Sequence, residues 1–592
     1  MNSRTSNLSL KPWILSLLVL LPCVSAAAAY MGLHDVLLGL FFVLGLSAFV
    51  AILKGNDNFD DRLIMMLVWS VGLSLLLSSA FASDYIRGAD VHREYLVALQ
   101  TSTTGVWRTN QFDPYTSVLS VAILPAMINI LSGITMVQVF KFVYPVLFSL
   151  VPVILYKITR KIFAPGAAFL SVFLFMSYDS FYDQMIALGR QEIAEILLTL
   201  LILVLLSPAI SKSRSGTLTL IFLTFGFVAS HYALAYIFIF ILAYSCLTSR
   251  TFRKTKGSML LGLVSVVGMA WYMFAASGAG FLALGHSISS ISGVLTNGIF
   301  GLGSRPQELS KAIGSAPISS GLLQEVNRWT QILVQLCLLF GLLVLVCKKK
   351  SASEQEMLPL ITGGLIVLGS SIVLPEIAAT LNLGRIYHIA LLFISPCFIY
   401  ATERVELTLR SVGSRVESRR HFRLRAATQR RSLHVAAAIL FLYFLFVSGW
   451  FTVVTAGVPT SYILDSNRMR DSTNLAVSEV YYGDSTVLPD IVGTSWLRSV
   501  RISSRAVCSD INAQRRVLTS YGEFPPSVGN YANYLPRQYN CHFSDSYVYL
   551  SEFNNRYGVG FTFNGTFPIS DISQTLSKMN RVYSNGETTL YA

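Results

Sequence analysis

The stretch that decides the fold is LIMMLVWSVGLSLLLSSAFA (63–82), followed at once by SDYIRGADVHREY (83–95). The first segment is long enough to cross a bilayer, because a spanning helix needs about 20 apolar residues. The second segment gathers acidic and basic side chains where that helix would leave the lipid. A charged loop at the end of an apolar helix predicts a functional site at one surface of a membrane.

The rest of the chain has the same apolar character. It has 592 residues, of which 53% are hydrophobic and 13% are charged, about half the charged fraction of a soluble globular protein. This composition excludes a disordered chain, a coiled coil, a disulfide scaffold and a purely soluble enzyme. The net charge is +14, but no helix-turn-helix, zinc-finger or aromatic RNA-binding pattern accompanies it. We therefore expect a lipid bilayer, and no nucleic acid, as a partner.

Apolar runs predict about thirteen spanning helices. They lie near 12–31, 34–53, 63–82, 137–157, 166–181, 191–208, 216–231, 233–248, 258–276, 330–347, 358–376, 386–402 and 433–455. A further apolar segment, SVLSVAILPAMINILSGI (117–134), is expected to lie on the outer surface or to re-enter the membrane against protein. The first run lacks a convincing cleavage site, so we expect an uncleaved helix rather than a signal peptide.

Basic residues predict the orientation. With the amino terminus in the cytoplasm, the predicted cytoplasmic segments hold 25 Lys and Arg residues, and the outer loops with their borders hold nine. Nine of the cytoplasmic ones are arginines between Arg404 and Arg431, a stretch expected to contact anionic lipid. The positive-inside rule favours this arrangement. We expect a multi-pass protein of the cell (plasma) membrane with an extracytoplasmic carboxyl terminus.

The predicted fold class is a polytopic α-helical membrane protein with a C-terminal extracytoplasmic α/β domain. The predicted regions are two N-terminal helices with a cytoplasmic loop (1–62), a membrane catalytic region (63–455) with an outer loop (84–136), and the α/β domain (456–592). Polar, aromatic and alternating sequence favours an α/β fold in the last region. Cys508 and Cys541 could form a disulfide there, and Asn564 begins a glycosylation sequon.

Asp90 is the leading candidate for a functional residue. It lies just outside the predicted bilayer, where a lipid-borne substrate would present its head group. Glu94 follows four positions later and shares its helix face, with His92 between them. The alternative is a solvated interfacial loop, which we prefer for Asp84, Arg87 and Arg93.

Three later segments carry further candidates. YDSFYDQMIALGRQEIAE (178–195) places five ionisable groups between two short spans, either as ion pairs that seal a helix end or as functional groups: Asp179, Asp183, Arg190, Glu192 and Glu195. SHYALAY (230–236) places His231 and Tyr232 at a chain reversal, where a structural role is the alternative. LGRIYHIALLFISP (383–396) places Arg385 and His388 three positions apart on one helical face.

Arg385 has the chemistry of a phosphate ligand. Its planar guanidinium makes two parallel hydrogen bonds to phosphate oxygens and stays charged at any relevant pH. The alternative is a snorkelling arginine that fixes topology. Because it lies on the side that the positive-inside rule disfavours, we prefer the functional interpretation.

The arrangement resembles the GT-C superfamily of integral-membrane glycosyltransferases, which includes oligosaccharyltransferases, protein O-mannosyltransferases and lipid A aminoarabinose transferases. Asp90 matches the acidic residue of the first outer loop, 117–134 the surface helices and Arg385 the phosphate-binding arginine. The strings GADVHREY, SVLSVAILP, VFKFVYPVLFSLVP and SHYALAY resemble an uncharacterised archaeal membrane-protein family grouped with these enzymes. The resemblance covers most of 63–402. It departs in two extra early spans and in the lack of a clear D-x-D motif.

The resemblance implies an inverting transfer of a sugar from a polyprenyl (dolichyl) phosphate to a lipid, glycan or protein acceptor on the outer face. Asp90 would be the general base. Arg385 would stabilise the departing phosphate, helped by Arg190, His231, Tyr232 or His388. Candidates for positioning the acceptor, or for holding a divalent cation (Mg²⁺ or Mn²⁺) as cofactor, are Glu94, His92, Asp183 and Glu192.

Three other functions stay open from the sequence. A transporter or flippase would also place ionisable groups near spans, but usually near the midplane and in repeated halves, and the chain shows no internal repeat. An O-antigen polymerase or ligase would act on similar lipid-linked sugars. A non-catalytic membrane scaffold would leave Asp90 and Arg385 unexplained.

Overall fold

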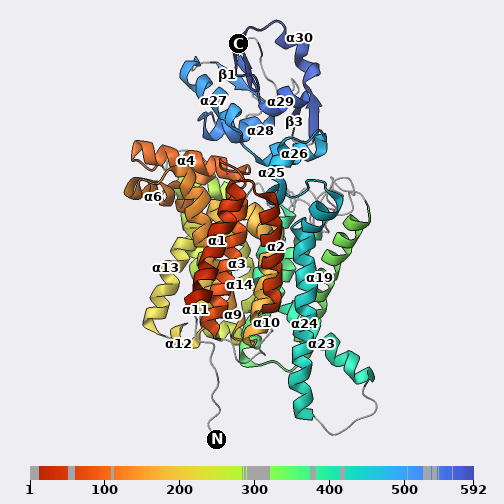
Figure 1. Cartoon of the computed structure of the whole chain (residues 1–592). Helices are drawn as coiled ribbons and strands as arrows, with labels where there is room; N and C mark the ends of the chain where they lie inside the picture. The colour runs from red at the N-terminus through yellow and green to blue at the C-terminus, as the bar shows by residue number, and fades with distance from the viewer. Residues whose placement is uncertain are drawn as a thin grey trace.

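The computed structural model describes most of the chain. The described residues are 12–50, 60–108, 113–211, 213–282, 321–373, 382–413, 421–502, 505–524, 546–562 and 565–592, with a few single residues between these ranges. Cys541, Asn564 and part of the basic stretch after Arg404 lie outside them. Figure 1 shows a bundle of long helices with a C-terminal domain, residues 456–592, at its upper end.

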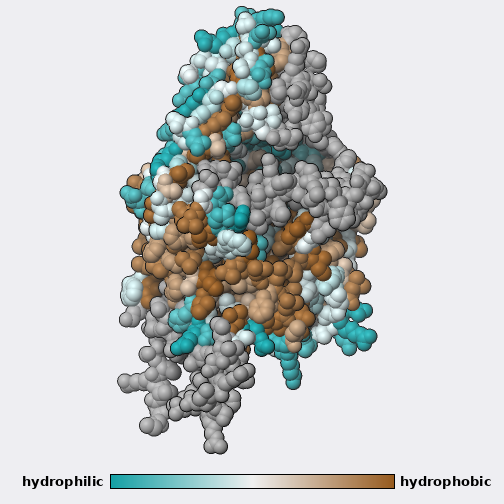
Figure 2. Space-filling view, turned by 90° about the vertical axis from the view of Figure 1, so that its right-hand side faces the viewer, coloured by the Kyte–Doolittle hydropathy of each residue, from teal (hydrophilic) through white to brown (hydrophobic). Residues whose placement is uncertain are grey.

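The bundle consists of apolar helices that bury one another's side chains. Its main members are α1 (Pro12–Tyr30), α2 (His34–Val50), α3 (Asp61–Phe81), α8 (Tyr144–Phe148), α9 (Leu150–Thr159), α10 (Pro165–Ser177), α11 (Gly189–Leu205), α13 (Arg214–Ser230), α14 (Tyr232–Thr248), α16 (Ser258–Phe274), α19 (Leu322–Cys347), α20 (Ala352–Val373), α22 (Leu383–Ile394), α23 (Pro396–Gly413) and α24 (His421–Val447). α10 is buried along its whole length. Other helices turn large apolar side chains outward, including Phe222, Leu247 and Val266. Figure 2 shows this apolar surface as a band below the more polar C-terminal domain.

Five described helices are long and apolar enough to cross a membrane: Pro12–Tyr30, Asp61–Phe81, Met136–Thr159, Leu322–Cys347 and Ala352–Ile372. Leu383–Ile394 and Pro396–Thr408 would make a sixth if this pair, bent by 62°, is one span. The sequence suggested one continuous run at 386–402, but Pro396 interrupts the helix because proline lacks the N–H that a continuous helix needs. Several other apolar helices are shorter, and the count of thirteen spans stays a prediction.

The segment before α8 runs across the end of the bundle. It consists of α4 (Asp90–Thr104), the 3₁₀ turn η1 (Pro114–Ser117), α5 (Leu119–Ala122), α6 (Leu124–Ser132), α7 (Met136–Gln138) and the π-helical turn η2 (Val139–Val143). Figure 1 shows α4 and α6 lying crosswise to the long helices. Met127, Ile130 and Leu131 are exposed on α6, while Val121 and Ala122 of α5 are buried. An apolar face of this kind suits a membrane interface.

The C-terminal domain contains a four-stranded mixed sheet in the order β1 (Ala506–Cys508), β2 (Ser546–Leu550), β6 (Thr589–Tyr591) and β5 (Arg581–Ser584). β1 is parallel to β2, and the other pairs are antiparallel. A separate hairpin joins β3 (Val559–Thr562) and β4 (Gly565–Pro568). The helical elements are α25 (Tyr462–Arg470), α26 (Leu475–Asp484), α27 (Leu488–Val500), α28 (Ile511–Ala513), η8 (Gln514–Leu518), α29 (Glu552–Tyr557), η11 (Ile569–Ile572) and α30 (Ser573–Leu576). Cys508 is disulfide-bonded.

Polar contacts attach this domain to the bundle. The Gly88 amide donates to the Asp484 carbonyl oxygen at 2.8 Å, and His34 Nδ1 lies 2.8 Å from Asp465 Oδ1. Gly88 has a φ of +97°, a conformation that glycine adopts without strain. The chain therefore makes a sharp turn at Gly88, directly before α4, and that turn is held by the C-terminal domain.

Candidate active site

The N-terminal turns of three helices meet at Asp90. Asp90 is the first residue of α4, Arg190 the second residue of α11 and Arg385 the third residue of α22. Arg190 Nη2 donates to Asp90 Oδ2 at 3.0 Å, and Arg385 Nη1 donates to the same oxygen at 2.9 Å. Helix N-termini carry partial positive charge, so three of them together with two guanidiniums favour an anion here.

Arg190 also joins Asp90 to Glu94. Arg190 Nη1 donates to Glu94 Oε1 at 2.6 Å, one helical turn below Asp90. The Tyr115 ring lies beneath the same guanidinium, 4.6 Å from its carbon. The Glu94 side chain is fully buried, whereas those of Asp90 and Arg385 are 21% and 28% exposed. The pair Asp90 and Arg385 is therefore the part of the site that a solute can reach.

The two carboxyl groups on α4 differ in acidity. Burial alone would raise the pKa of Asp90, but the Arg190 and Arg385 guanidiniums outweigh it and hold the pKa at about 2. Burial raises the pKa of Glu94 to about 7, against the opposing effect of Arg190. Asp90 is thus ionised throughout the physiological range, and Glu94 changes its charge near neutrality.

Several buried polar atoms at the site have no hydrogen-bond partner among the described residues. They include the Nε atoms of Arg190 and Arg385 and Oε2 of Glu94. Unsatisfied buried donors are uncommon in folded proteins and require an explanation. Two arginine N–H groups left unpaired beside Asp90 are consistent with a site that receives hydrogen-bond acceptors from a ligand.

His231 and Tyr232 lie at the edge of this site. His231 is the N-cap of α14, where its Nδ1 accepts from the Leu234 amide at 3.3 Å. The charges of Arg190, Arg385 and Asp90 all act on the His231 ring, and those of Arg190 and Asp90 act on Tyr232. His231 is held by its capping role, and the charges of the Asp90 site reach both it and Tyr232.

His388 faces a different environment. Its Nε2 lies 3.1 Å from Glu195 Oε2, and Gln191 donates to the other oxygen of Glu195 at 2.8 Å. The ring is fully buried and packs 4.8 Å from that of Phe175. The expectation that it shares a phosphate with Arg385 has no support in this geometry, because one helical turn places it about 4.5 Å deeper in the bundle.

Asp183 and Glu192 make no hydrogen bond or ion pair with Asp90 or Arg385 among the described residues, although the charge of Glu94 acts on Glu192. Asp183 forms an ion pair with Arg87, whose guanidinium lies 4.0 Å above the Tyr462 ring. This contact ties the first loop to the start of the C-terminal domain. Glu192 is buried on α11, and its Oε1 has no hydrogen-bond partner among the described residues.

His92 connects α4 to the C-terminal domain. Ser520 Oγ donates its proton to the Arg516 carbonyl oxygen at 3.0 Å, so it accepts from His92 Nδ1, 2.7 Å away. His92 Nε2 then accepts from Thr486 Oγ1 at 3.3 Å. Burial lowers the pKa of His92 well below its ordinary value, so the ring is neutral. Both ring nitrogens therefore form hydrogen bonds with the C-terminal domain.

No three Asp, Glu, His or Cys side chains within the described ranges converge as a metal site. Asp90 and Glu94 are both bound by Arg190, which lies between them. The position that a divalent cation would take between them is filled by a guanidinium. Asp90 and Glu94 therefore do not hold a cation between them in this arrangement.

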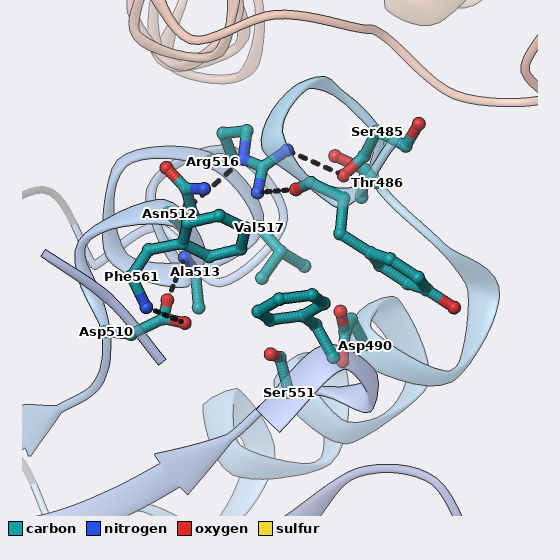
Figure 3. Close-up of a pocket in the computed structure, with 12 residues that line it drawn as sticks. Ser485, Thr486, Asp490, Asp510, Asn512, Ala513, Arg516, Val517, Ser551 and Phe561 are labelled. Atoms are coloured by element: carbon teal, nitrogen blue, oxygen red, sulfur yellow. Dashed lines mark hydrogen bonds between the residues drawn. The ribbon is translucent and has the colours of Figure 1, made fainter. Parts of the chain in front are cut away.

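A small cavity in the C-terminal domain has a structural explanation. Figure 3 shows Asp510 and Arg516 among its lining residues. Asp510 accepts from the Ala513 and Phe561 amides at 2.8 and 3.2 Å, and Arg516 donates to the carbonyl oxygens of Ser485 and Tyr482. These hydrogen bonds hold the segment after α28 against the loop after α26.

Sequence analysis did not find two features of this region. One is the pairing of Glu195 with His388, and the other is the Tyr115 ring under Arg190. Each joins segments that are far apart in the chain, and no local pattern indicates either contact. The charges within 178–195 indicate Glu195 itself, but nothing in the sequence indicates His388 as its partner.

Comparisons with known proteins give a family and a likeness among solved structures. No curated protein matches the chain. Among the solved structures that match is the crystal structure of the Archaeoglobus fulgidus oligosaccharyltransferase, tethered with an acceptor peptide containing the NVT sequon via a disulfide bond. It is 14% identical, with a TM-score of 0.46 over 83% of this chain and 69% of that one. A family model described as "Predicted membrane protein (DUF2206)" matches residues 216–591. Because that match spans more than half of the chain, this protein belongs to the DUF2206 family of membrane proteins.

Proposed function

We propose that this protein is a membrane glycosyltransferase that moves a sugar from a polyprenyl-phosphate carrier to an acceptor at the end of the bundle where the C-terminal domain sits. The observation that carries the proposal is the contact of Arg190 and Arg385 with one oxygen of Asp90. It combines a carboxylate base with cations for a phosphate, at the end of a bundle whose outer surface carries many apolar side chains. The sequence resemblance to GT-C enzymes supports the same assignment.

The arginine contacts explain how the base would become active. A carboxyl with a pKa of about 2 is a weak base, because an effective general base has a pKa nearer the working pH. A donor phosphate would compete with Asp90 for Arg385, which is the more exposed of its two partners. Losing that partner raises the pKa of Asp90, so donor binding would itself prepare the base.

The transfer step then follows. Asp90 accepts the proton of an acceptor hydroxyl or amide, whose oxygen or nitrogen forms a bond to the anomeric carbon of the sugar. The bond from that carbon to the phosphate oxygen breaks on the opposite face, which inverts the configuration. Arg385 holds the departing polyprenyl phosphate, whose charge increases as the bond breaks. No step is assigned to a cation.

The direct test incubates the purified protein with a panel of polyprenyl-phosphate sugars, alone and with glycolipid and peptide acceptors. We expect release of free polyprenyl phosphate by the wild type. Arg385→Lys keeps the charge but loses the planar fork, so the apparent affinity for donor should fall about tenfold, and Arg385→Ala should lose more.

Arg328→Ala is the matched control, because Arg328 forms an exposed ion pair with Glu325 elsewhere on the bundle. It should release polyprenyl phosphate at the wild-type rate. If Arg385→Ala also did so, the phosphate role would be wrong. If no donor in the panel were cleaved but intact donor crossed the membrane of a proteoliposome, the protein would be a flippase instead.

A further inference from the structure

The C-terminal domain holds a short segment firmly against α4. The segment comprises η8 and the residues up to Tyr521. Arg516 anchors it from inside the domain, since its buried guanidinium donates to the carbonyl oxygens of Ser485 and Tyr482. Figure 3 shows this side chain reaching from its own helical turn towards Ser485 and Thr486. The segment therefore has a fixed position on its own domain.

The same segment contacts α4 directly beside Asp90. Ser520 accepts from His92, two residues after Asp90, at 2.7 Å. The Tyr521 ring packs between those of Tyr85 and Tyr95, with centroid distances of 5.9 and 5.6 Å. These contacts lie on both sides of Asp90 in the sequence, so the segment covers the first turn of α4.

Arg515 is the exposed residue of this segment. Its neighbour Arg516 is buried, whereas Arg515 is exposed. Its side chain makes no hydrogen bond or ion pair within the part of the chain that the structure describes. Its charge nevertheless acts on Asp90 and helps to lower the pKa of that carboxyl. Because Ser520 and Tyr521 of the same segment contact the first turns of α4, the exposed guanidinium lies on the side of the domain that faces Asp90, and among the described residues it has no other partner.

The charges around Asp90 leave the site cationic. Arg190, Arg385 and Arg515 contribute three positive charges, Asp90 contributes one negative charge, and Glu94 is about half ionised near neutral pH because its pKa is about 7. A sugar phosphodiester of a lipid carries one negative charge, and the lipid phosphate released from it carries more. A third guanidinium would offset the charge that the leaving phosphate gains.

We propose that Arg515 is a further phosphate-binding residue, supplied by the C-terminal domain, which holds phosphoryl oxygens of the lipid-linked donor opposite Arg385. This assignment rests on the proposed glycosyltransferase function. It gives the C-terminal domain a direct part in the donor site. It also explains why the domain is attached so closely to the first turn of α4.

The test measures binding of farnesyl phosphate and farnesyl diphosphate, short analogues of the carrier, to the purified full chain. Arg515→Gln should weaken binding of both about tenfold, because it removes a charge-assisted contact. Arg515→Lys should recover part of the loss. The effect should shrink at high salt, since the side chain is exposed. If Arg515→Gln weakened the binding of farnesyl diphosphate more than that of farnesyl phosphate, Arg515 would contact the second phosphoryl group.

Two controls distinguish the outcomes. Arg581→Gln removes an exposed arginine from β5 of the same domain, and its binding should equal that of the wild type. The melting temperature of Arg515→Gln should be unchanged, since the side chain makes no bond to lose. If Arg515→Gln bound both ligands normally while Arg385→Gln did not, the inference would be wrong and the proposed function would stand. If both variants bound normally, the proposed function would fail as well. Weaker binding with an equally lowered melting temperature would also overturn the inference, in favour of a structural role.

Discussion

At the scale of single residues, one arginine gives two neighbouring carboxyl groups different properties. Arg190 contacts both Asp90 and Glu94, but Asp90 has a second partner in Arg385 and is partly exposed. Glu94 is fully buried, and its one ion-pair partner within the described part of the chain is Arg190. Burial penalises a charge that is not fully compensated. Asp90 therefore stays ionised, and Glu94 can hold a proton near neutral pH.

This difference predicts that anion binding depends on pH. Below pH 7 Glu94 is protonated and the site is more positive, and above pH 7 it adds a negative charge beside Arg190. Affinity for a phosphodiester donor analogue, whose own charge is constant, should fall about three- to tenfold as the pH rises from 6 to 8. Calorimetric titration at several pH values measures this affinity.

Glu94→Gln is the control for that titration. The amide mimics the protonated acid, so binding should be as tight as in the wild type at pH 6 and should not weaken at pH 8. A variant that kept the wild-type pH dependence would assign the titration to another group.

At the scale of elements, the turn at Gly88 sets the position of α4. A Cβ at Gly88 would lie 2.3 Å from the Ala187 Cβ, and its φ of +97° disfavours any other residue. Gly88→Ala should therefore displace the start of α4 from α11 and α22 and reduce transfer by at least about tenfold. A transfer assay combined with a thermal melt checks this expectation.

Gly105→Ala provides the comparison for backbone strain. Gly105 ends α4 with a φ of +66°, but a Cβ there meets nothing within 4 Å. It should cost about 1 kcal/mol of stability and leave transfer intact. Equal activity losses in the two variants would show that strain, rather than the contact with Ala187, determines the effect.

The sequence predicts the helices better than it predicts which helices contact one another. Apolar runs locate most bundle helices, and charges at their ends point to Asp90, Arg190 and Arg385. Their convergence joins residues 100 and 295 positions apart, and local patterns carry no information on such pairs. The inward direction of His388 depends on packing in the same way. The break at Pro396 is instead a local effect of the proline, which the apolar character of the run 386–402 concealed.

At the scale of the whole molecule, the C-terminal domain completes the upper surface of the site. His92, Gly88 and Tyr521 join it to the loop that carries Asp90. Sequence composition favours a separate α/β domain but does not indicate this contact, because the domain's polar side chains have no distinctive spacing. The position of the domain relative to the membrane then decides on which side the reaction occurs.

The positive-inside count predicts an extracytoplasmic C-terminal domain. In a cysteine-depleted background, Asn580→Cys should react with a membrane-impermeant maleimide in intact cells. Lys349→Cys, in the predicted cytoplasmic loop at 348–350, should react only after permeabilisation. Both side chains are exposed, so accessibility reports the side of the membrane. Labelling of position 349 but not of position 580 in intact cells would invert the topology and move the site to the cytoplasmic face.

The central claim is that Asp90 is the base and that Arg385 exchanges it for the donor phosphate. The most direct measurement is the single-turnover rate of polyprenyl phosphate release by Asp90→Asn, with donor affinity measured separately and Glu94→Gln as the internal comparison. The rate should fall about 100-fold or more, and donor affinity should be unchanged or higher because a neutral amide competes less for Arg385 than the carboxylate does. Glu94→Gln should lose much less. A near-normal rate in Asp90→Asn would contradict the account and move the base elsewhere, to Asp183 or Glu192.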